Sequence, residues 1–152
     1  MPGVVVGEMD GVEHVRRYVW GTDRMFKLEP KFSESKTVEK GWGREIVFAN
    51  NNEYCGKILE IKQGGEFSMH YHIDKRETFY LLEGSVEVRY FDLETAKKLS
   101  YYVQDVGSVV DIPRCCPHQI HALVNSKIIE VSTHHKDSDS YRIAAGDSQK
   151  QV

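Results

Sequence analysis

The stretch Gly64–Gly84, GGEFSMHYHIDKRETFYLLEG, places two histidines and a glutamate where one metal ion can hold all three. His70 and His72 are two residues apart, so in an extended strand their side chains leave the same face. After a turn of four residues, Glu77 opens an apolar stretch that can run back antiparallel and direct its carboxylate to the same point. A fourth ligand is available from His118. Three imidazoles and one carboxylate suit Fe, Mn, Ni, Cu or Zn rather than Ca or Mg.

The same stretch resembles the first sequence motif of the cupin superfamily. That motif reads G, five residues, HxH, three or four residues, E, six residues and G. Every position is met here, by Gly64, His70, His72, Glu77 and Gly84. The resemblance implies a jelly-roll barrel, the cupin double-stranded β-helix, with a metal ion bound between its sheets.

The second cupin motif is met in part. It reads G, five residues, PxG, two residues, H, three residues and N. Gly107, Pro113 and His118 match it, whereas Cys115 stands in place of the second glycine and Ala122 in place of the asparagine. The two motifs and the strands around them cover roughly residues 42 to 133, which is most of the chain.

From residue 42 onwards the sequence predicts an all-β domain. Short runs of β-branched and aromatic residues are separated by Gly, Asn and Asp at close intervals, which is typical of strands and turns. We expect strands at 44–49, 54–62, 67–72, 78–82, 85–91, 99–103, 109–112, 119–124 and 127–133. Such a set of short strands without a long helix indicates a double-sheet jelly roll.

The expected organisation has three parts. Residues 1–40 are predicted to be a short N-terminal arm that packs on the barrel, with a short strand at 4–6 and a helix or turn over 12–20, where apolar residues recur at helical spacing. Residues 41–135 are predicted to form the cupin barrel. Residues 136–152 are polar and are predicted to cover one end of the barrel as a C-terminal tail.

Length and composition limit the functional class. The chain of 152 residues is long enough for one domain with a core. Its net charge of −3 gives no electrostatic reason to expect a nucleic acid as partner. No apolar run approaches the length of a membrane span, and the first eleven residues lack a basic segment followed by a long apolar one. We therefore expect a cytoplasmic protein that binds neither nucleic acid nor membrane.

The other histidines are interpreted as structural or surface residues. His14 lies in the arm, and His134 and His135 follow the last expected strand. His121 has an odd offset from His118 and is expected to face the other way.

The cysteines show no zinc-knuckle or CxxC spacing. Cys115 and Cys116 are neighbours, whose Cα atoms are closer than ordinary disulfide geometry requires. An alternative is that one of them lines the mouth of the metal site, because both are close in sequence to His118.

Several segments resemble a narrower group. Gly41–Gly43 resembles a PWG entry, Lys57–Lys62 with Gly64 a VKxIxVxPG segment, Ile112–His118 an IPxGxxH segment, Ile129–Val131 an IEV segment, and Asp139–Arg142 a DDxxR tail. These are features of the cupin domain of type II phosphomannose isomerases and related sugar-phosphate enzymes. That family usually has Gln at the position of His70, Pro at the positions of Gly41 and Gln63, and Trp at the position of Phe79.

This resemblance implies a metal-dependent isomerase that acts on an anionic sugar. The ion would hold the carbonyl and the neighbouring hydroxyl of an open-chain sugar while a base moves a proton between the two carbons. Lys57 and Arg142 are the candidates for binding an anionic group or steadying the developing charge, with Tyr80 as a third.

Other functions remain open. The ligand set also fits an Fe- or Ni-dependent dioxygenase or lyase, which oxygen consumption or air-sensitive activity would reveal. A barrel that binds a small ligand without catalysis, with or without a metal, is a third hypothesis, since one fold hosts many functions. In each metal-dependent case we expect one divalent transition metal ion, Zn, Mn, Fe or Ni, as cofactor. Because cupins commonly pair through their sheets, we expect a homodimer.

Overall fold

The computed structural model describes residues 30–149. Contacts divide the chain into two units, Met1–Phe32 and Ser33–Val152, and every element below belongs to the second. The predicted strand at 4–6, the predicted helix at 12–20 and His14 lie outside the described residues. Within the described part, no helix has the length and apolar character to cross a membrane.

Eleven strands and two short 3₁₀ turns form residues 30–149, with no α-helix in that range. The strands are β1 (Lys36–Lys40), β2 (Gly43–Asn50), β3 (Cys55–Ile61), β4 (Met69–Tyr71), β5 (Glu77–Glu83), β6 (Val86–Asp92), β7 (Lys97–Val103), β8 (Val109–Ile112), β9 (His118–Ala122), β10 (Ser126–Ser132) and β11 (Tyr141–Ala144). The 3₁₀ turns are η1 (Asp137–Asp139) and η2 (Asp147–Gln149). The nine strands expected from the sequence are all present, with ends within two residues of the prediction.

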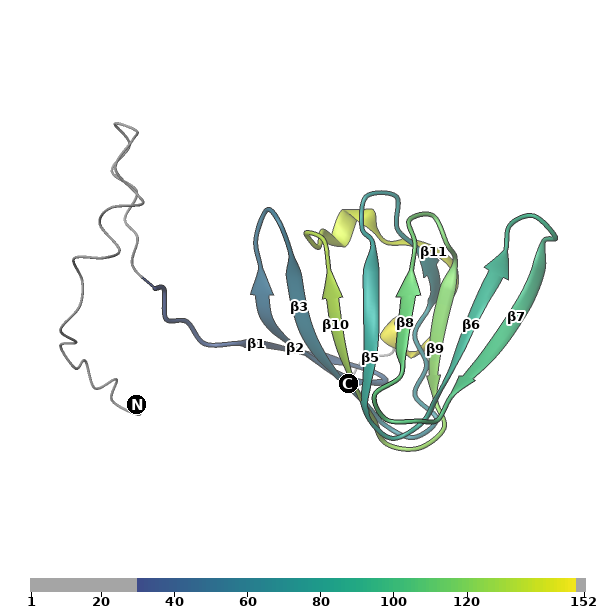
Figure 1. Cartoon of the computed structure of the whole chain (residues 1–152), viewed down its shortest axis with the longest axis horizontal. Coiled ribbons are helices and arrows are strands. Elements are labelled where there is room, and N and C mark those ends of the chain that lie inside the picture. Colours follow the sequence, from purple (N-terminus) through teal and green to yellow (C-terminus); the bar gives the residue numbers. More distant parts are fainter. Residues whose placement is uncertain (1–29, 150–152) are drawn as a thin grey trace. The chain divides into compact units, whose positions relative to one another are not determined.

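The strands form two antiparallel sheets (Figure 1). The six-stranded sheet has the order β1-β2-β3-β10-β5-β8, and the five-stranded sheet has the order β11-β4-β9-β6-β7. Alternating apolar residues of both sheets fill the space between them, including Leu59, Phe79, Val88, Ile120 and Ile128. This confirms the predicted all-β jelly roll.

The sheets extend beyond the predicted barrel boundaries at both ends. Residues 36–40, assigned above to the arm, form β1 and pair with β2. Residues 141–144, assigned to the polar tail, form β11 and pair with β4, where Tyr141 stacks on Tyr71 at 5.2 Å between ring centroids. Both are edge strands that are largely exposed, so neither shows the apolar alternation that identifies a strand in a sequence.

Gly84 shows why the first motif ends on a glycine. It lies in the turn from β5 to β6 with φ of 87°, a conformation that favours glycine. A Cβ there would lie 2.5 Å from the backbone oxygen of Asn125. The position therefore requires glycine both for its conformation and for the close approach of the neighbouring turn.

The outer face of the six-stranded sheet carries a continuous apolar row. Cross-strand pairing joins, in order, Ile46, Ile58, Ile129, Tyr80 and Val109 of β2, β3, β10, β5 and β8. Tyr80 is 39% exposed and Val109 is 63% exposed. Because its neighbours Phe79 and Leu81 are buried in the core, Tyr80 points away from the space between the sheets.

Candidate metal centre

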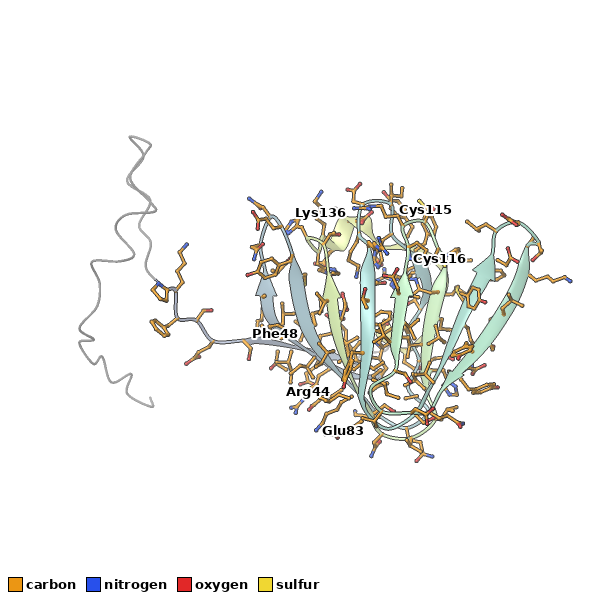
Figure 2. The ribbon with its side chains drawn as sticks, in the orientation of Figure 1. Arg44, Phe48, Glu83, Cys115, Cys116 and Lys136 are labelled. Atoms are coloured by element: carbon orange, nitrogen blue, oxygen red, sulfur yellow. The ribbon has the colours of Figure 1, made fainter. Side chains whose placement is uncertain are left out.

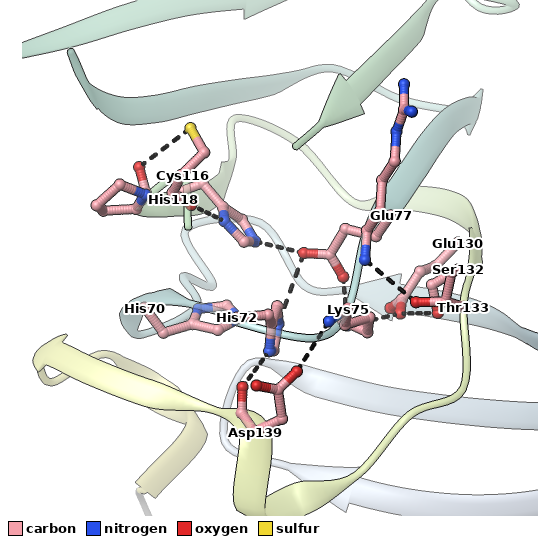
Figure 3. A network of polar contacts seen from close by, with 12 residues as sticks. His70, His72, Lys75, Glu77, Cys116, His118, Glu130, Ser132, Thr133 and Asp139 are labelled. Atoms are coloured by element: carbon pink, nitrogen blue, oxygen red, sulfur yellow. Dashed lines mark hydrogen bonds and ion pairs between the residues drawn. The ribbon is translucent and has the colours of Figure 1, made fainter. Parts of the chain in front are cut away.

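The structure brings the four predicted metal ligands together. One ligand atom from each of His70, His72, Glu77 and His118 lies within 4.8 Å of the others. His70 on β4 pairs directly with His118 on β9, while Glu77 opens β5 in the opposite sheet. The cluster therefore connects the inner faces of both sheets (Figure 3).

Each histidine of the cluster is oriented by a backbone carbonyl. His70 Nδ1 donates to the Ser68 oxygen at 2.8 Å, and His118 Nδ1 donates to the Cys116 oxygen at 2.9 Å. His72 Nδ1 donates to the Asp139 oxygen at 2.6 Å. Since a carbonyl can only accept, the proton of each ring sits on Nδ1, and Nε2 keeps a lone pair for a metal ion.

The atoms that face one another in the cluster have no hydrogen-bond donor. His118 Nε2 lies 2.6 Å from Glu77 Oε1, and His72 Nε2 lies 3.6 Å from the same oxygen. All three atoms are buried and have no hydrogen-bond partner within residues 30–149. With protons on Nδ1, these three atoms are all acceptors, and packing acceptors together is unfavourable unless a cation lies between them. The residues present therefore fit a divalent transition metal ion.

The charge states of the cluster are those of metal ligands. Burial, reinforced by the nearby His118 ring, lowers the pKa of His70 to about 3. Burial and the Lys75 ammonium also lower the pKa of His72. Burial alone would raise the pKa of Glu77, but His118 and Lys75 hold it well below its usual range. At neutral pH His70 and His72 are thus neutral imidazoles and Glu77 is an ionised carboxylate, as metal binding requires.

Asp139 holds the loop that joins the ligands of β4 and β5. Its buried carboxylate accepts backbone N–H bonds from Ile73 at 2.9 Å, Asp74 at 3.1 Å and Lys75 at 2.9 Å. Its own carbonyl orients His72. Burial alone would raise the pKa of Asp139, but these N–H donors lower it. Asp139 lies far from this loop in sequence, so only the tertiary structure reveals its role.

Cys115 occupies the position of the motif glycine and adopts the backbone that glycine favours, with φ of 62°. Its backbone N–H donates to the His72 oxygen at 2.7 Å. Figure 2 shows Cys115 at the end of the barrel where Lys136 lies, opposite Arg44 and Glu83. Neither Cys115 nor Cys116 lines the cavity beside the four clustered residues, so the structure does not support the alternative that a thiol lines the mouth of the metal site.

A polar cavity of about 410 Å³ opens beside the cluster. Two of the three residues expected to act on substrate, Lys57 and Arg142, line it, whereas Tyr80 does not. Tyr80 faces outwards because it alternates with the buried Phe79 along β5. His135 also lines the cavity, although the sequence suggested only a structural or surface role.

Lys57 and Arg142 differ in their contacts. Lys57 is 3% exposed, and its Nζ lies 3.4 Å from Glu45 Oε2 and 3.9 Å from Glu130 Oε2. Arg142 lies directly across from His70 in the β11–β4 register, so the two side chains share one face of the sheet. Its guanidinium has no ion pair within the described residues and is exposed. Arg142 is therefore the cation available to an anionic ligand beside the cluster.

His121 belongs to a separate network, as its offset predicted. Its Nδ1 lies 3.1 Å from the Arg89 guanidinium and 3.3 Å from Glu87 Oε2. Sequence reasoning missed two other buried residues that line the cavity, Lys75, which contacts Glu77, and Glu130, which pairs with Lys75. Lysine and glutamate in a turn and a strand are usually solvated, so no local signal indicated their burial.

Comparison with known proteins identifies the fold. No protein-family model matches the sequence, and no curated protein matches it. The capsular polysaccharide assembling protein CapF from Staphylococcus aureus has a TM-score of 0.63 and 21% identity, covering 75% of this chain and 34% of CapF. Oxalate decarboxylase from Bacillus subtilis has a TM-score of 0.64 and 18% identity, covering 93% of this chain and 40% of the decarboxylase.

A shorter protein, KdgF from Halomonas sp., has a TM-score of 0.55 and 18% identity, with coverage of 70% of this chain and 90% of KdgF. This chain spans only about a third of CapF and two fifths of the decarboxylase. These structures are cupin-fold proteins, and at such identities the similarity concerns the fold. The chain therefore has the cupin fold, with a His₃Glu cluster between its two sheets.

Proposed function

We propose that this chain is a metal-dependent enzyme that holds one divalent transition metal ion through His70, His72, Glu77 and His118. The observation that carries the proposal is the convergence of buried acceptor atoms without a donor between them. A bound ion would supply Lewis-acid polarisation of a substrate oxygen. The adjacent cavity of about 410 Å³ is of a size that suits a small molecule.

The substrate that fits this cavity best is a small anion, and we propose a phosphorylated sugar undergoing isomerisation. Arg142 supports this choice because it lies across from His70 and its guanidinium has no ion pair within the part of the chain that the structure describes. It would bind the anionic group, since guanidinium geometry matches carboxylate and phosphate oxygens. Lys57 would stabilise the cavity wall rather than contact the substrate, because its ammonium already pairs with two carboxylates.

The metal content of untagged protein prepared without chelator tests this function. We expect about one ion per chain by elemental analysis, because the ligand set is complete within one chain. Zn or Mn would direct the assay to sugar-phosphate isomerisation, while Fe or Ni would direct it to oxygen uptake for the dioxygenase alternative and to lyase substrates for the lyase alternative. If the protein holds no metal, and adding Mn, Fe, Ni or Zn does not raise its melting temperature, the enzymatic proposal is wrong and a ligand-binding role replaces it.

Replacing Arg142 tests the substrate class. Arg142→Met is expected to raise KM for a phosphorylated substrate roughly 10- to 100-fold, because one charge-assisted contact is lost. Metal content should stay at the wild-type value. Arg44→Met, which removes an arginine paired with Glu60 on the outer sheet face, is the matched control and should leave KM unchanged. Equal KM values for Arg142→Met and wild type would exclude Arg142 from substrate binding.

We also propose that two copies of the chain pair through the outer apolar row. An isologous interface requires that the same surface of both copies meet at a two-fold axis. Such an axis along the row would place it against the same row of the second copy, which consists of Ile46, Ile58, Ile129, Tyr80 and Val109. Such pairing would cover side chains that are apolar and partly exposed in the single chain.

Light scattering tests this pairing. Wild type is expected to show twice the 17.5 kDa chain mass. Val109→Glu should shift the protein to the single-chain mass, because a charge would be buried in the row. Leu93→Glu, at a site that is 67% exposed in the β6–β7 turn of the other sheet, should not. A dimer that persists in Val109→Glu would contradict this interface.

A further inference from the structure

A series of acidic and basic side chains, in alternating order, leads up to the metal cluster. Glu45 and Glu130 flank Lys57, whose Nζ lies 3.4 Å and 3.9 Å from their carboxylates. Glu130 Oε1 accepts from Lys75 Nζ at 3.0 Å, and Lys75 Nζ also contacts Glu77 Oε2. Lys57, Glu130, Lys75 and Glu77 are each at most 4% exposed. The series thus runs from the cavity wall to the carboxylate ligand without a break.

Lys75 makes the two carboxylate oxygens of Glu77 unequal, because it contacts only one of them. Oε2 is engaged by the Lys75 ammonium, while Oε1 faces the histidine nitrogens, 2.6 Å from His118 Nε2. Figure 3 shows Lys75 on one side of this carboxylate and His118 on the other. Only Oε1 is therefore free to contact an ion. From this geometry we infer that Lys75 is a positioning residue, which makes Glu77 a ligand through one oxygen only.

Lys75 is itself held at both ends. Its backbone N–H donates to Asp139 Oδ2 at 2.9 Å, and its ammonium donates to Glu130 Oε1. Ser132 Oγ donates to the same Glu130 oxygen at 3.4 Å, which keeps that carboxylate in place. Burying an ammonium is costly without partners, and two carboxylates supply them. The Lys75 side chain is thus fixed before any ion arrives.

The inference rests on the proposed function. It adds how many coordination positions of the ion the protein would occupy. Three histidine nitrogens and one oxygen of Glu77 would hold the ion through four atoms, and a six-coordinate ion would then have two positions left for water or for two substrate oxygens. Without Lys75, the carboxylate could turn and offer both oxygens, which would leave one position fewer. Lys75 would therefore determine whether a substrate can bind through two atoms.

Co²⁺ binding to Lys75→Met tests this role, with Arg76→Met as the matched control. Arg76 is the next residue, but its guanidinium is exposed and pairs with Asp111 on the surface. We expect the Kd of Lys75→Met for Co²⁺ to rise roughly 10- to 100-fold, as is typical when a group that supports a ligand is lost. Its visible Co²⁺ spectrum should also change, because the coordination by Glu77 changes. Arg76→Met should match wild type in both measurements.

The outcomes separate this inference from the proposed function. If wild type binds no Co²⁺, both are wrong. If wild type binds Co²⁺ and Lys75→Met gives the same Kd and the same spectrum, only the role of Lys75 is overturned. A lower melting temperature with an unchanged spectrum would show a merely structural role and would also overturn it. Should Lys75→Met fail to fold, Lys75→Gln, which keeps a donor but not the charge, carries the same test.

Discussion

Glu77→Gln is expected to abolish metal binding at micromolar ion concentrations. The substitution keeps the size of the side chain but removes the only carboxylate among the four ligands, and a neutral amide is a poor ligand for a divalent ion. It also leaves the buried Lys75 with one carboxylate partner instead of two. Loss of a partner from a buried ion pair costs about 3 kcal/mol in the free energy of unfolding. Elemental analysis and urea denaturation would measure the two effects.

The stability effect has a defined pH dependence. Because the pKa of Glu77 is lower in the folded protein than in the unfolded chain, its stabilisation is complete above the unfolded pKa and is lost as the pH falls through the folded value. The difference between wild type and Glu77→Gln should therefore shrink on acidification. Glu83→Gln is the control, since Glu83 lies on the same strand but pairs with Lys127 at the surface. Wild-type metal content in Glu77→Gln would contradict the ligand assignment.

Asp139→Ala is expected to lower both stability and metal affinity. Three backbone N–H groups of the loop before Glu77 would lose their common acceptor. Leaving such donors unsatisfied costs about 2 to 4 kcal/mol in total, because water can reach part of the loop. The loop connects His72 to Glu77, so its disorder should raise the Kd for Co²⁺ about tenfold or more. Chemical denaturation and a metal titration measure these effects.

The matched control for Asp139 lies in the same 3₁₀ turn. The side chain of Asp137 is fully exposed, and within residues 30–149 its carboxylate pairs only with the His135 ring, at 3.2 Å. Asp137→Ala should therefore change the free energy of unfolding by less than about 0.5 kcal/mol and leave the metal affinity unchanged. If Asp137→Ala and Asp139→Ala behaved alike, the loop would not depend on the Asp139 carboxylate.

The sequence alone determined the fold class and the four clustered residues. Strand alternation in a segment such as 127–133 follows from burial of one face, which is a local pattern that can be read without a structure. The HxH spacing places His70 and His72 on one face for the same reason. The structure brings the four residues together because His70, Glu77 and His118 lie on strands and His72 directly follows β4, with their side chains in the space between the sheets.

The tertiary structure alone decided the surroundings of that cluster. Asp139, Lys75 and Glu130 act on Glu77 and its loop through contacts between residues that are distant in sequence or unremarkable in type. Tyr80 was expected near the site, but strand alternation places it on the outer face beside the buried Phe79. β1 and β11 were missed because exposed edge strands are held by backbone pairing, which leaves no apolar pattern in the sequence. Periodicity thus records which face of a strand is buried, whereas charge pairing between strands depends on register and chain crossings that only the folded structure defines.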